Sequence, residues 1–442
     1  MKQILEPIET AYGICGDQKL QERTHYRRSR HCVSVECEEG TLLFHTLTGE
    51  LLLIGKNEKE ETIREQLVRR WFLVPDSFDE CEQSDTVHRL AALLNPFEKN
   101  KNTFTILTTT DCNARCFYCY EKGIPRFSMN EKTAKDVGEY IARECGGKKV
   151  SLSWFGGEPL YNQEAIDIIC TVLRDHGIAY SSILTSNGFY LDQLTAKKAV
   201  DAWHVRSVQI TVDGTETVYN RTKAYINAEG SSFQRILRNI QNALDAGIHV
   251  SIRLNMDRQN AADLLELTEQ IGQRYGRRPN LSAHVILLQG IAGEVHEFAS
   301  DEEATFWTNQ INKKLDEYGY LRAGSLPRGV RINHCIADNP SCEVILPDGR
   351  IQRCEHFDEN EIVGNIYDET RNEEICRAWC EKVRFEKCTE CELFPMCVPL
   401  KRCPWRVNGC SDYRRKYLYN KLSRLILSMY NENNYQEEEN AL

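Results

Sequence analysis

The sequence predicts an α/β protein whose centre is a partial (β/α)6 TIM-like barrel, with a small β+α domain before it and a cysteine-rich domain after it. Three observations support this fold class. Six apolar, strand-like segments alternate with segments of helical periodicity between residues 104 and 290. The N-terminal residues instead alternate apolar and polar side chains around turn residues. Ten of the 19 cysteines lie between Cys335 and Cys410.

Residues 1–97 form the first predicted domain. Apolar and polar residues alternate over 32–55 around Glu-Glu-Gly and Thr-Gly turn signals, which predicts two or three short antiparallel strands. Helical spacing follows over 60–74, ending before Pro75, and again over 84–94. We therefore expect a small domain in which strands come first and helices follow.

Residues 98–300 form the predicted barrel. Its strand candidates are the apolar runs 104–110, 150–155, 182–187, 207–214, 250–257 and 283–290. Segments with helical periodicity lie between them, for example 130–144 and 232–247. Because the loops at the carboxyl ends of the strands carry the chemistry in such arrays, we expect the functional residues there.

The remaining chain divides into three predicted parts. Residues 301–334 are expected to form a helical bridge, with its clearest helix over 301–319. The cysteine-rich domain spans 335–412. Residues 413–442 are expected to form a helix over 413–430 and then a polar, acidic, disordered tail.

Composition narrows the function classes. The 55 Lys and Arg against 65 Asp and Glu give a net charge of −10, which argues against a nucleic-acid or anionic-membrane partner. No apolar run is long enough to span a bilayer, and the N-terminus has no apolar signal core, so we expect a cytoplasmic protein. In a reducing compartment 19 cysteines indicate metal or cluster ligands rather than disulfides.

The first cysteine group directly follows the first barrel strand. Cys112, Cys116 and Cys119 have the spacing C-x3-C-x2-C. Three thiolates this close can hold three corners of one [4Fe–4S] cluster and leave the fourth iron open to a small molecule. The alternative, a structural zinc site, needs a fourth ligand that the local sequence does not offer.

This loop resembles that of the radical SAM enzyme family. The resemblance implies that the open iron binds the amino and carboxylate groups of S-adenosylmethionine. It also implies that an electron from the cluster cleaves the sulfonium and yields a 5′-deoxyadenosyl radical. The protein's own share is binding, orientation and exclusion of water.

Further family motifs follow the later strands. Gly156-Gly157-Glu158 resembles the GGE motif, in which glycines let the backbone approach a ligand and the glutamate accepts a hydrogen bond from the methionyl ammonium. Ser186-Asn187 and Asp213 resemble the (T/S)NG and S-x-D-G motifs. The cofactor-binding residues that the resemblance implies are Tyr118, Gly156, Gly157, Glu158, Ser186, Asn187 and Asp213, with Arg221 or Lys223 pairing with the cofactor carboxylate. Tyr118 lies against the adenine on this hypothesis, and is a core aromatic on the alternative one.

The C-terminal cysteines resemble the SPASM domain of many radical SAM enzymes, which makes this part a predicted iron–sulfur domain with two auxiliary [4Fe–4S] clusters. Carried over, one cluster has the ligands Cys335, Cys354 and Cys403, with Cys342 as the fourth. The other has the ligands Cys388, Cys391, Cys397 and Cys410. Lys401 stands where the usual spacing has a cysteine, so the assignment within each cluster stays open. Zinc knuckles are the alternative for these cysteines, and packing is the expected role of Cys376 and Cys380.

Glu355, directly after Cys354, is the candidate catalytic residue. Sulfatase maturases carry an aspartate at the corresponding position, where it takes a proton from the substrate. The alternative is an exposed glutamate on a hairpin. His334 and His356 flank the same ligands and are expected to donate hydrogen bonds near a cluster rather than to bind iron.

Residues 1–97 resemble, in architecture only, the precursor-recognition domains of ribosomal-peptide maturases, which bind a leader peptide as an added β-strand. The predicted function is therefore oxidative crosslinking of a ribosomally made peptide, through a thioether or a carbon–carbon bond. The expected partners are that precursor peptide and a reductant such as a flavodoxin or ferredoxin. The alternatives are a sulfatase maturase that makes formylglycine and a zinc-binding scaffold without catalysis.

Overall fold

The computed structural model divides the chain into two units, which are described separately. It describes residues 1–8, 18–94, 100–226, 229–288, 295–321, 326, 332–356, 358–394, 396–404 and 409–441. The first unit comprises Met1–Pro96, Ala323–His334 and Glu381–Leu442. The second comprises Phe97–Arg322 and Cys335–Cys380. In the described part of the chain, no helix is both long and apolar enough to cross a membrane.

The second unit contains the predicted barrel. Its six parallel strands are β7 (Thr103–Thr109), β8 (Val150–Gly156), β9 (Tyr180–Ser186), β10 (Val205–Thr211), β11 (His249–Met256) and β12 (Leu281–Leu287). They pair in chain order in one sheet, for example with Phe104 opposite Leu152. The expectation of a βα array with six strands is thus confirmed, with boundaries that differ from the expected ones by at most three residues.

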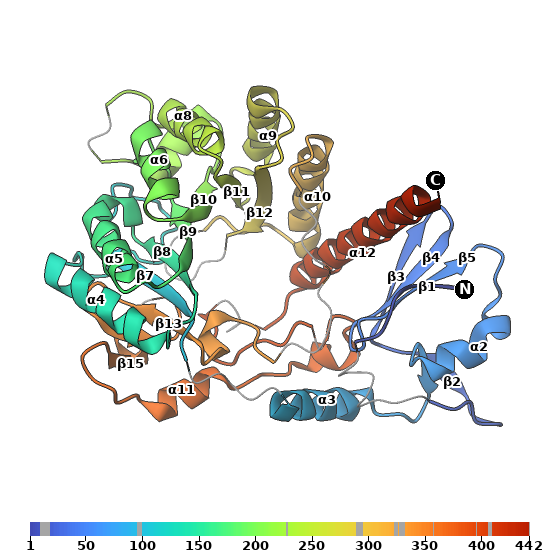
Figure 1. The fold of residues 1–442 in the computed structure, drawn as a ribbon. Helices are drawn as coiled ribbons and strands as arrows, with labels where there is room; N and C mark the ends of the chain where they lie inside the picture. Colours follow the sequence, from blue (N-terminus) through green and yellow to red (C-terminus); the bar gives the residue numbers. More distant parts are fainter. Residues whose placement is uncertain are drawn as a thin grey trace. The chain divides into compact units, whose positions relative to one another are not determined.

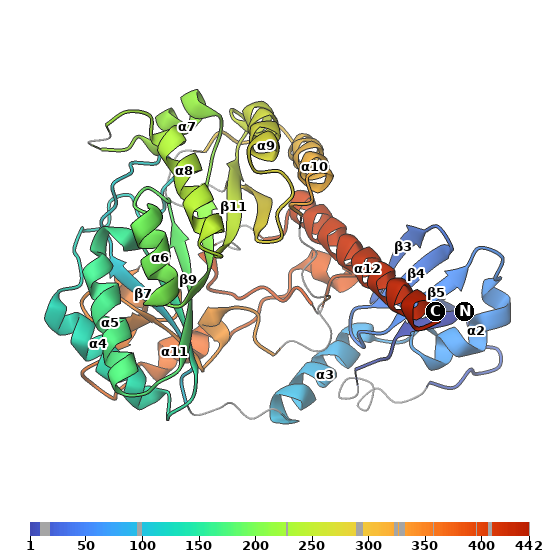
Figure 2. The same ribbon diagram turned by 45° about the horizontal axis from the view of Figure 1, so that its top comes forward.

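Amphipathic helices join these strands and lie along the outside of the sheet (Figures 1 and 2). They are α4 (Glu131–Glu144), α5 (Gln163–Asp175), α6 (Gln193–Asp201), α7 (Glu216–Lys223), α8 (Ser232–Asp245), α9 (Ala261–Tyr275) and α10 (Asp301–Glu317). In α4 the side chain of Asn130 caps the N-terminus by accepting a hydrogen bond from Thr133 N, while Val137 and Ile141 are buried. The predicted bridge begins with α10, and its residues 322–325 and 327–331 lie outside the described chain.

The barrel sheet continues into the cysteine-rich region. Strand β13 (Cys342–Ile345) pairs in parallel with β7, and β14 (Arg350–Gln352) and β15 (Ile362–Asn365) follow as antiparallel neighbours. Helix α11 (Glu373–Trp379) completes this segment. The cysteine-rich domain expected at 335–412 is therefore divided, since residues up to Cys380 belong to the barrel unit. The physical reason is that β7 begins an open sheet, so its outer edge needs a partner strand.

The first unit is built on an antiparallel sheet of β1 (Lys2–Leu5), β3 (Cys32–Cys37), β4 (Gly40–His45) and β5 (Leu51–Gly55), in the order β1-β5-β4-β3. A second pair is formed by β2 (Tyr26–Arg28) and β6 (Leu73–Pro75), and the helices are α2 (Glu60–Arg69) and α3 (Glu80–Leu94). Helix α2 stops before the expected end at residue 74, because Trp71 takes a positive φ of 69° and the chain then enters β6.

Helix α12 (Asp412–Ala441) packs on this sheet through Leu422 and Ile426, which share a core with Val33 and Phe44. The disordered tail expected after residue 430 is wrong, because α12 continues to Ala441. Residues 412–441 contain no glycine or proline, and Glu and Gln have good helix propensities, so the acidic composition does not end the helix.

Candidate cluster and cofactor site

The loop that carries Cys112, Cys116 and Cys119 follows β7 and is tied to the end of α7. The backbone N–H of Arg115 donates to the carbonyl of Lys223 at 2.8 Å, and that of Ile226 donates to the carbonyl of Asn113 at 2.9 Å. These contacts fix the loop beside the carboxyl ends of the strands, where the sequence placed it.

Gly156 and Gly157 let the end of β8 pack against the start of this loop. A Cβ on Gly156, which has a φ of +115°, would lie 2.2 Å from the carbonyl oxygen of Thr109. A Cβ on Gly157 would lie 2.3 Å from the carbonyl oxygen of Asp111. The sequence suggested a close approach to a ligand, whereas the close approach in the structure is to the protein's own backbone. The glycines therefore position the cysteine loop.

The carboxylate of Glu158 is fully buried and joins the motifs of β8 and β9. Its Oε1 accepts hydrogen bonds from Ser186 Oγ at 2.8 Å and Leu160 N at 3.1 Å, and its Oε2 accepts one from Asn187 N at 2.7 Å. Burial raises the pKa of Glu158 to about 7, although these hydrogen bonds oppose the shift. Three donors thus orient the carboxylate without a ligand.

Two buried polar atoms near the cysteine loop have no hydrogen-bond partner in the part of the chain that the structure describes. Asn187 Nδ2 donates to Asn113 Oδ1 at 2.8 Å and lies 3.7 Å from Cys112 Sγ. Asn113 Nδ2, a donor, and Asp213 Oδ1, an acceptor, are buried with no hydrogen-bond partner among the described residues. Buried polar groups are normally paired, so an unpaired donor and acceptor near the cysteine loop suit a polar small molecule such as S-adenosylmethionine.

Tyr118, Asp213 and Lys223 form a buried polar cluster. Lys223 Nζ lies 2.9 Å from both Asp213 Oδ2 and the Tyr118 hydroxyl, and that hydroxyl donates to Asp213 Oδ2. Burial lowers the pKa of Lys223, but the charge of Asp213 and further anionic neighbours outweigh it, so the net shift is strongly upward. Arg221, on the same helix, is exposed. The hydrogen bonds of Tyr118 could not be read from the sequence.

The three cysteines of the loop are partly shielded from solvent. Burial raises the pKa of Cys112 to about 12 and that of Cys119 to about 11, and it also raises the pKa of Cys116. Iron must therefore displace a proton from each thiol as it binds. Across the described ranges no three His, Cys, Asp or Glu side chains are gathered around the position of a single metal ion. The loop therefore fits a cluster in which each of its three thiolates binds a different iron.

The hairpin that carries Cys354 lies against the residues that follow Cys119. The centres of the Tyr120 and His356 rings are 4.1 Å apart. Burial is the main cause that raises the pKa of Tyr120 well above its usual value of 10, and the charges of Glu121 and Glu355 raise it further. Glu355 is half-buried, and its Oε2 is a buried acceptor with no hydrogen-bond partner among the described atoms. An exposed hairpin glutamate is therefore not what the structure shows.

Glu121 was missed at the level of sequence. Burial alone raises its pKa to about 7. Its only sequence signal is its place two residues after Cys119, which does not distinguish it from any loop glutamate. Glu121 thus joins Glu355 as a carboxylate beside Tyr120.

The cysteines assigned to the auxiliary clusters fall in both units. Cys388, Cys391, Cys397 and Cys410 line one hollow of the first unit, together with apolar side chains such as Leu393 and Phe394. The four thiols that the sequence grouped together are therefore close together in space.

The other predicted ligands have different surroundings. Cys335 is exposed, whereas Cys342 and Cys354 are buried in the barrel unit. The buried guanidinium of Arg353 donates to the carbonyls of Ala337 and Cys342 and so organises the loop between Cys335 and β13. Cys403 belongs to the first unit and is not among the residues around the hollow. The ligand set of Cys335, Cys342, Cys354 and Cys403 stays a prediction.

Residues 106–271 match the model of the radical SAM superfamily. The chain carries a radical SAM domain. A GTP 3′,8-cyclase of Nautilia profundicola is 28% identical over 182 residues, which are 40% of this chain and 54% of the cyclase. This chain therefore spans about half the length of that relative.

Two solved structures share more of the fold than the radical SAM domain alone. The structure of anSMEcpe with bound AdoMet and Cp18Cys peptide has a TM-score of 0.58 at 14% identity and covers 76% of this chain and 99% of that chain. The structure of Streptococcus suis SuiB bound to precursor peptide SuiA has a TM-score of 0.50 at 13% identity and covers 87% of this chain and 95% of that chain. At these identities the likeness establishes the fold.

Proposed function

We propose that this radical SAM enzyme modifies a ribosomally made peptide by hydrogen abstraction and oxidative crosslinking, and that it carries two auxiliary [4Fe–4S] clusters besides the cluster that binds S-adenosylmethionine. The observation that carries the proposal is the hollow lined by Cys388, Cys391, Cys397 and Cys410. Four thiolates complete a cluster without an open iron, which suits an electron acceptor. Both similar structures hold a peptide, which supports a peptide substrate.

Cys112, Cys116 and Cys119 would hold the first cluster, and the residues around them would orient the cofactor. When bound, the cluster and S-adenosylmethionine supply the one-electron cleavage that starts hydrogen abstraction. A lysine ammonium has three donors. Lys223 uses two on Asp213 and Tyr118, so its third can meet the cofactor carboxylate. We assign this role to Lys223 rather than to the exposed Arg221.

Glu355 is the proposed base of the oxidative step. Its buried, unpaired Oε2 would take the proton that the substrate loses as the new bond forms. The substrate would also lose a hydrogen atom, for which the cofactor supplies the radical chemistry, and an electron, for which an auxiliary cluster would be the acceptor. The net change is the loss of two hydrogens, and a flavodoxin or ferredoxin would supply the electron that begins the next turnover.

The sheet of the first unit offers the peptide a place to bind. Strands β1 and β3 are the two edge strands of this sheet, and a peptide can pair with an edge strand as a further strand. On β3 the hydroxyl of Tyr419 donates to the carbonyl of Ser34 at 2.8 Å, so a peptide at this edge competes with α12 for that carbonyl. Truncating the Tyr419 side chain should therefore tighten peptide binding along β3.

The test uses the iron-loaded full-length enzyme with S-adenosylmethionine, dithionite and each short cysteine- or aromatic-rich peptide that sequencing of the neighbouring reading frames reveals. The expected result is a peptide that has lost two hydrogens, with one 5′-deoxyadenosine formed per crosslink. Parallel reactions contain GTP or a sulfatase-type cysteine peptide. Consumption of GTP with an unmodified peptide would refute peptide modification, and conversion of only the sulfatase-type peptide to formylglycine would refute crosslinking.

A further inference from the structure

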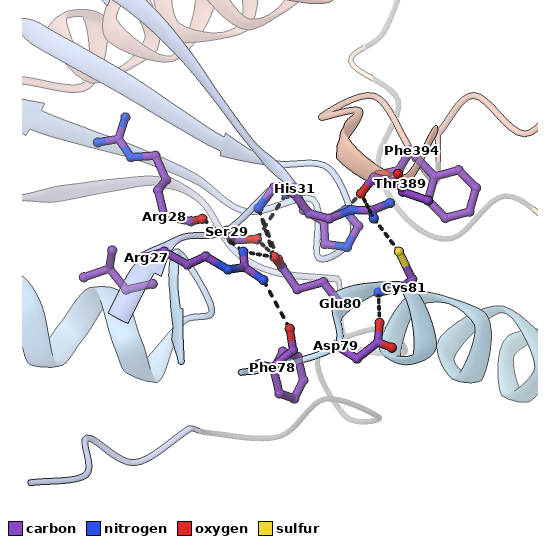
Figure 3. Close-up of polar contacts among 12 residues, drawn as sticks. Arg27, Arg28, Ser29, His31, Phe78, Asp79, Glu80, Cys81, Thr389 and Phe394 are labelled. Carbon is purple, nitrogen blue, oxygen red and sulfur yellow. Dashed lines mark hydrogen bonds and ion pairs between the residues drawn. The ribbon is translucent and has the colours of Figure 1, made fainter. Parts of the chain in front are cut away.

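The loop Cys388–Phe394 carries two of the four cysteines around the hollow and is held by side chains from the N-terminal part of the first unit. Four of its seven carbonyls accept hydrogen bonds from such side chains, namely those of Cys388, Thr389, Glu392 and Phe394. Its helical turn, η4 (Glu386–Glu390), is only five residues long, and among the described residues only the Cys388 carbonyl of these four also accepts a backbone hydrogen bond at the turn, from Cys391 N at 3.3 Å. Figure 3 shows the contacts around residues 27–31.

Arg30 makes the largest share of these contacts. Its Nη2 donates to the carbonyl of Cys388 at 3.1 Å, and its Nη1 donates to that of Thr389. The same Nη1 lies 2.6 Å from Cys81 Sγ, and the guanidinium stands 5.3 Å from the centre of the Phe394 ring. The planar guanidinium carries five donors in a rigid fork, which suits this contact with two successive carbonyls.

His31 and Thr46 hold the second half of the loop. His31 Nδ1 lies 2.7 Å from the carbonyl oxygen of Phe394, so this nitrogen carries the proton and donates it. Burial lowers the pKa of His31 to about 4, which keeps the ring neutral. The hydroxyl of Thr46 donates to the carbonyl of Glu392 at 3.0 Å.

The buried carboxylate of Glu80 fixes the turn from which Arg30 and His31 project. It accepts hydrogen bonds from Ser29 Oγ at 2.5 Å and from Arg30 N at 3.2 Å, and it pairs with the Arg27 guanidinium (Figure 3). Ser29 and Glu80 are almost fully buried. A buried, multiply bonded carboxylate resists movement, so the turn presents its donors to the loop in one arrangement.

We infer that Arg30, His31 and Thr46 are positioning residues for the auxiliary cluster at Cys388, Cys391, Cys397 and Cys410. They fix the carbonyls around Cys388 and Cys391 before iron arrives, so that cluster binding does not have to order this loop. The N-terminal residues thus build a cluster site in addition to any peptide site they offer. This inference rests on the auxiliary cluster of the proposed function.

The test is the iron content of anaerobically reconstituted full-length protein. The test variant carries Arg30→Met and Thr46→Val, which both remove hydrogen-bond donors to the loop. Methionine keeps an unbranched apolar side chain at position 30, and valine keeps the branched shape of threonine at position 46. Three [4Fe–4S] clusters give about twelve irons per wild-type chain, and loss of one cluster leaves about eight. The reduced variant should also lack the electron paramagnetic resonance signal of one cluster, while 5′-deoxyadenosine formation without peptide continues and shows that the barrel is folded.

Arg28→Ala is the matched control. Arg28 lies two residues before Arg30, but its exposed side chain contacts Ser34 and Glu60 rather than the Cys388 loop, so this variant should keep about twelve irons. Twelve irons and an unchanged spectrum in the double variant would overturn the inference and leave the proposed function standing. About four irons in the wild type would overturn both. Thr46→Val alone removes one hydroxyl and should slow cluster assembly even if the double variant does not fold.

Discussion

The pair of Asp213 and Lys223 allows a prediction with a definite magnitude. Both side chains are almost completely buried, at 0% and 3% exposure, with 2.9 Å between Lys223 Nζ and Asp213 Oδ2. Lys223→Met keeps the backbone carbonyl that accepts from Arg115 N, but it leaves the Asp213 carboxylate buried without its counter-ion, with the Tyr118 hydroxyl still donating to it. Removing one partner of a buried ion pair costs about 3–5 kcal/mol, so we expect the free energy of unfolding to fall by that amount.

The assay is a guanidinium titration of the iron-loaded protein, followed by tryptophan fluorescence. Arg221→Ala, an exposed position on the same helix, should change the free energy of unfolding by no more than about 0.5 kcal/mol. Replacing both partners, Asp213→Leu with Lys223→Met, should recover more than half of the loss, because no charge then stays buried. A loss below about 1 kcal/mol for Lys223→Met would refute the reasoning, since that value is typical of an exposed pair.

Three further predictions address other parts of the site. Gly157→Ala should lower the amount of iron bound at the Cys112 loop, because the new Cβ would lie 2.3 Å from the carbonyl oxygen of Asp111. In the control Gly55→Ala the new Cβ would lie 3.6 Å from the side chain of Glu58, so the iron content should not change. Cys397→Ala should lower the iron content by about four irons per chain, whereas Cys376→Ala should not lower it. An equal loss of iron in the two variants would contradict the assignment of one cluster to the cysteines around the hollow. The pKa of His31 is about 4 folded and 6.5 unfolded, so its neutral form stabilises the fold above pH 6.5, and this stability is lost as the pH falls toward 4. Between pH 7 and 5.5 the loss is about 1 kcal/mol, and denaturation of His31→Phe should show a correspondingly smaller pH dependence.

The sequence predicted the structure best where burial of apolar side chains alone determines the secondary structure. Strands β7 to β12 were predictable because buried parallel strands are continuous apolar runs, as in the segment around Ile106. The division of the cysteine-rich region after Cys380 was not predictable. It depends on the pairing of β13 with the open edge of β7. A strand of four residues has too short a sequence pattern to predict that it pairs with a strand more than 200 residues away.

The candidate site shows the same contrast. The four cysteines that the sequence grouped by their short spacing line one hollow, and that they bind one cluster stays a prediction. The contacts of Arg30 and His31 with the Cys388 loop link residues more than 350 positions apart and have no local pattern. Likewise, the exposure of Arg221 and the burial of Lys223 follow from the orientation of α7, which two cations on one short helix cannot reveal.

The central claim is that Cys112, Cys116 and Cys119 hold a cluster that cleaves S-adenosylmethionine. Its most direct test is the formation of 5′-deoxyadenosine by anaerobically reconstituted protein with S-adenosylmethionine and dithionite. The wild type should form it, and the variant with all three cysteines changed to alanine should form none while keeping the iron of the other cysteines. Formation of 5′-deoxyadenosine by the triple variant would contradict the account.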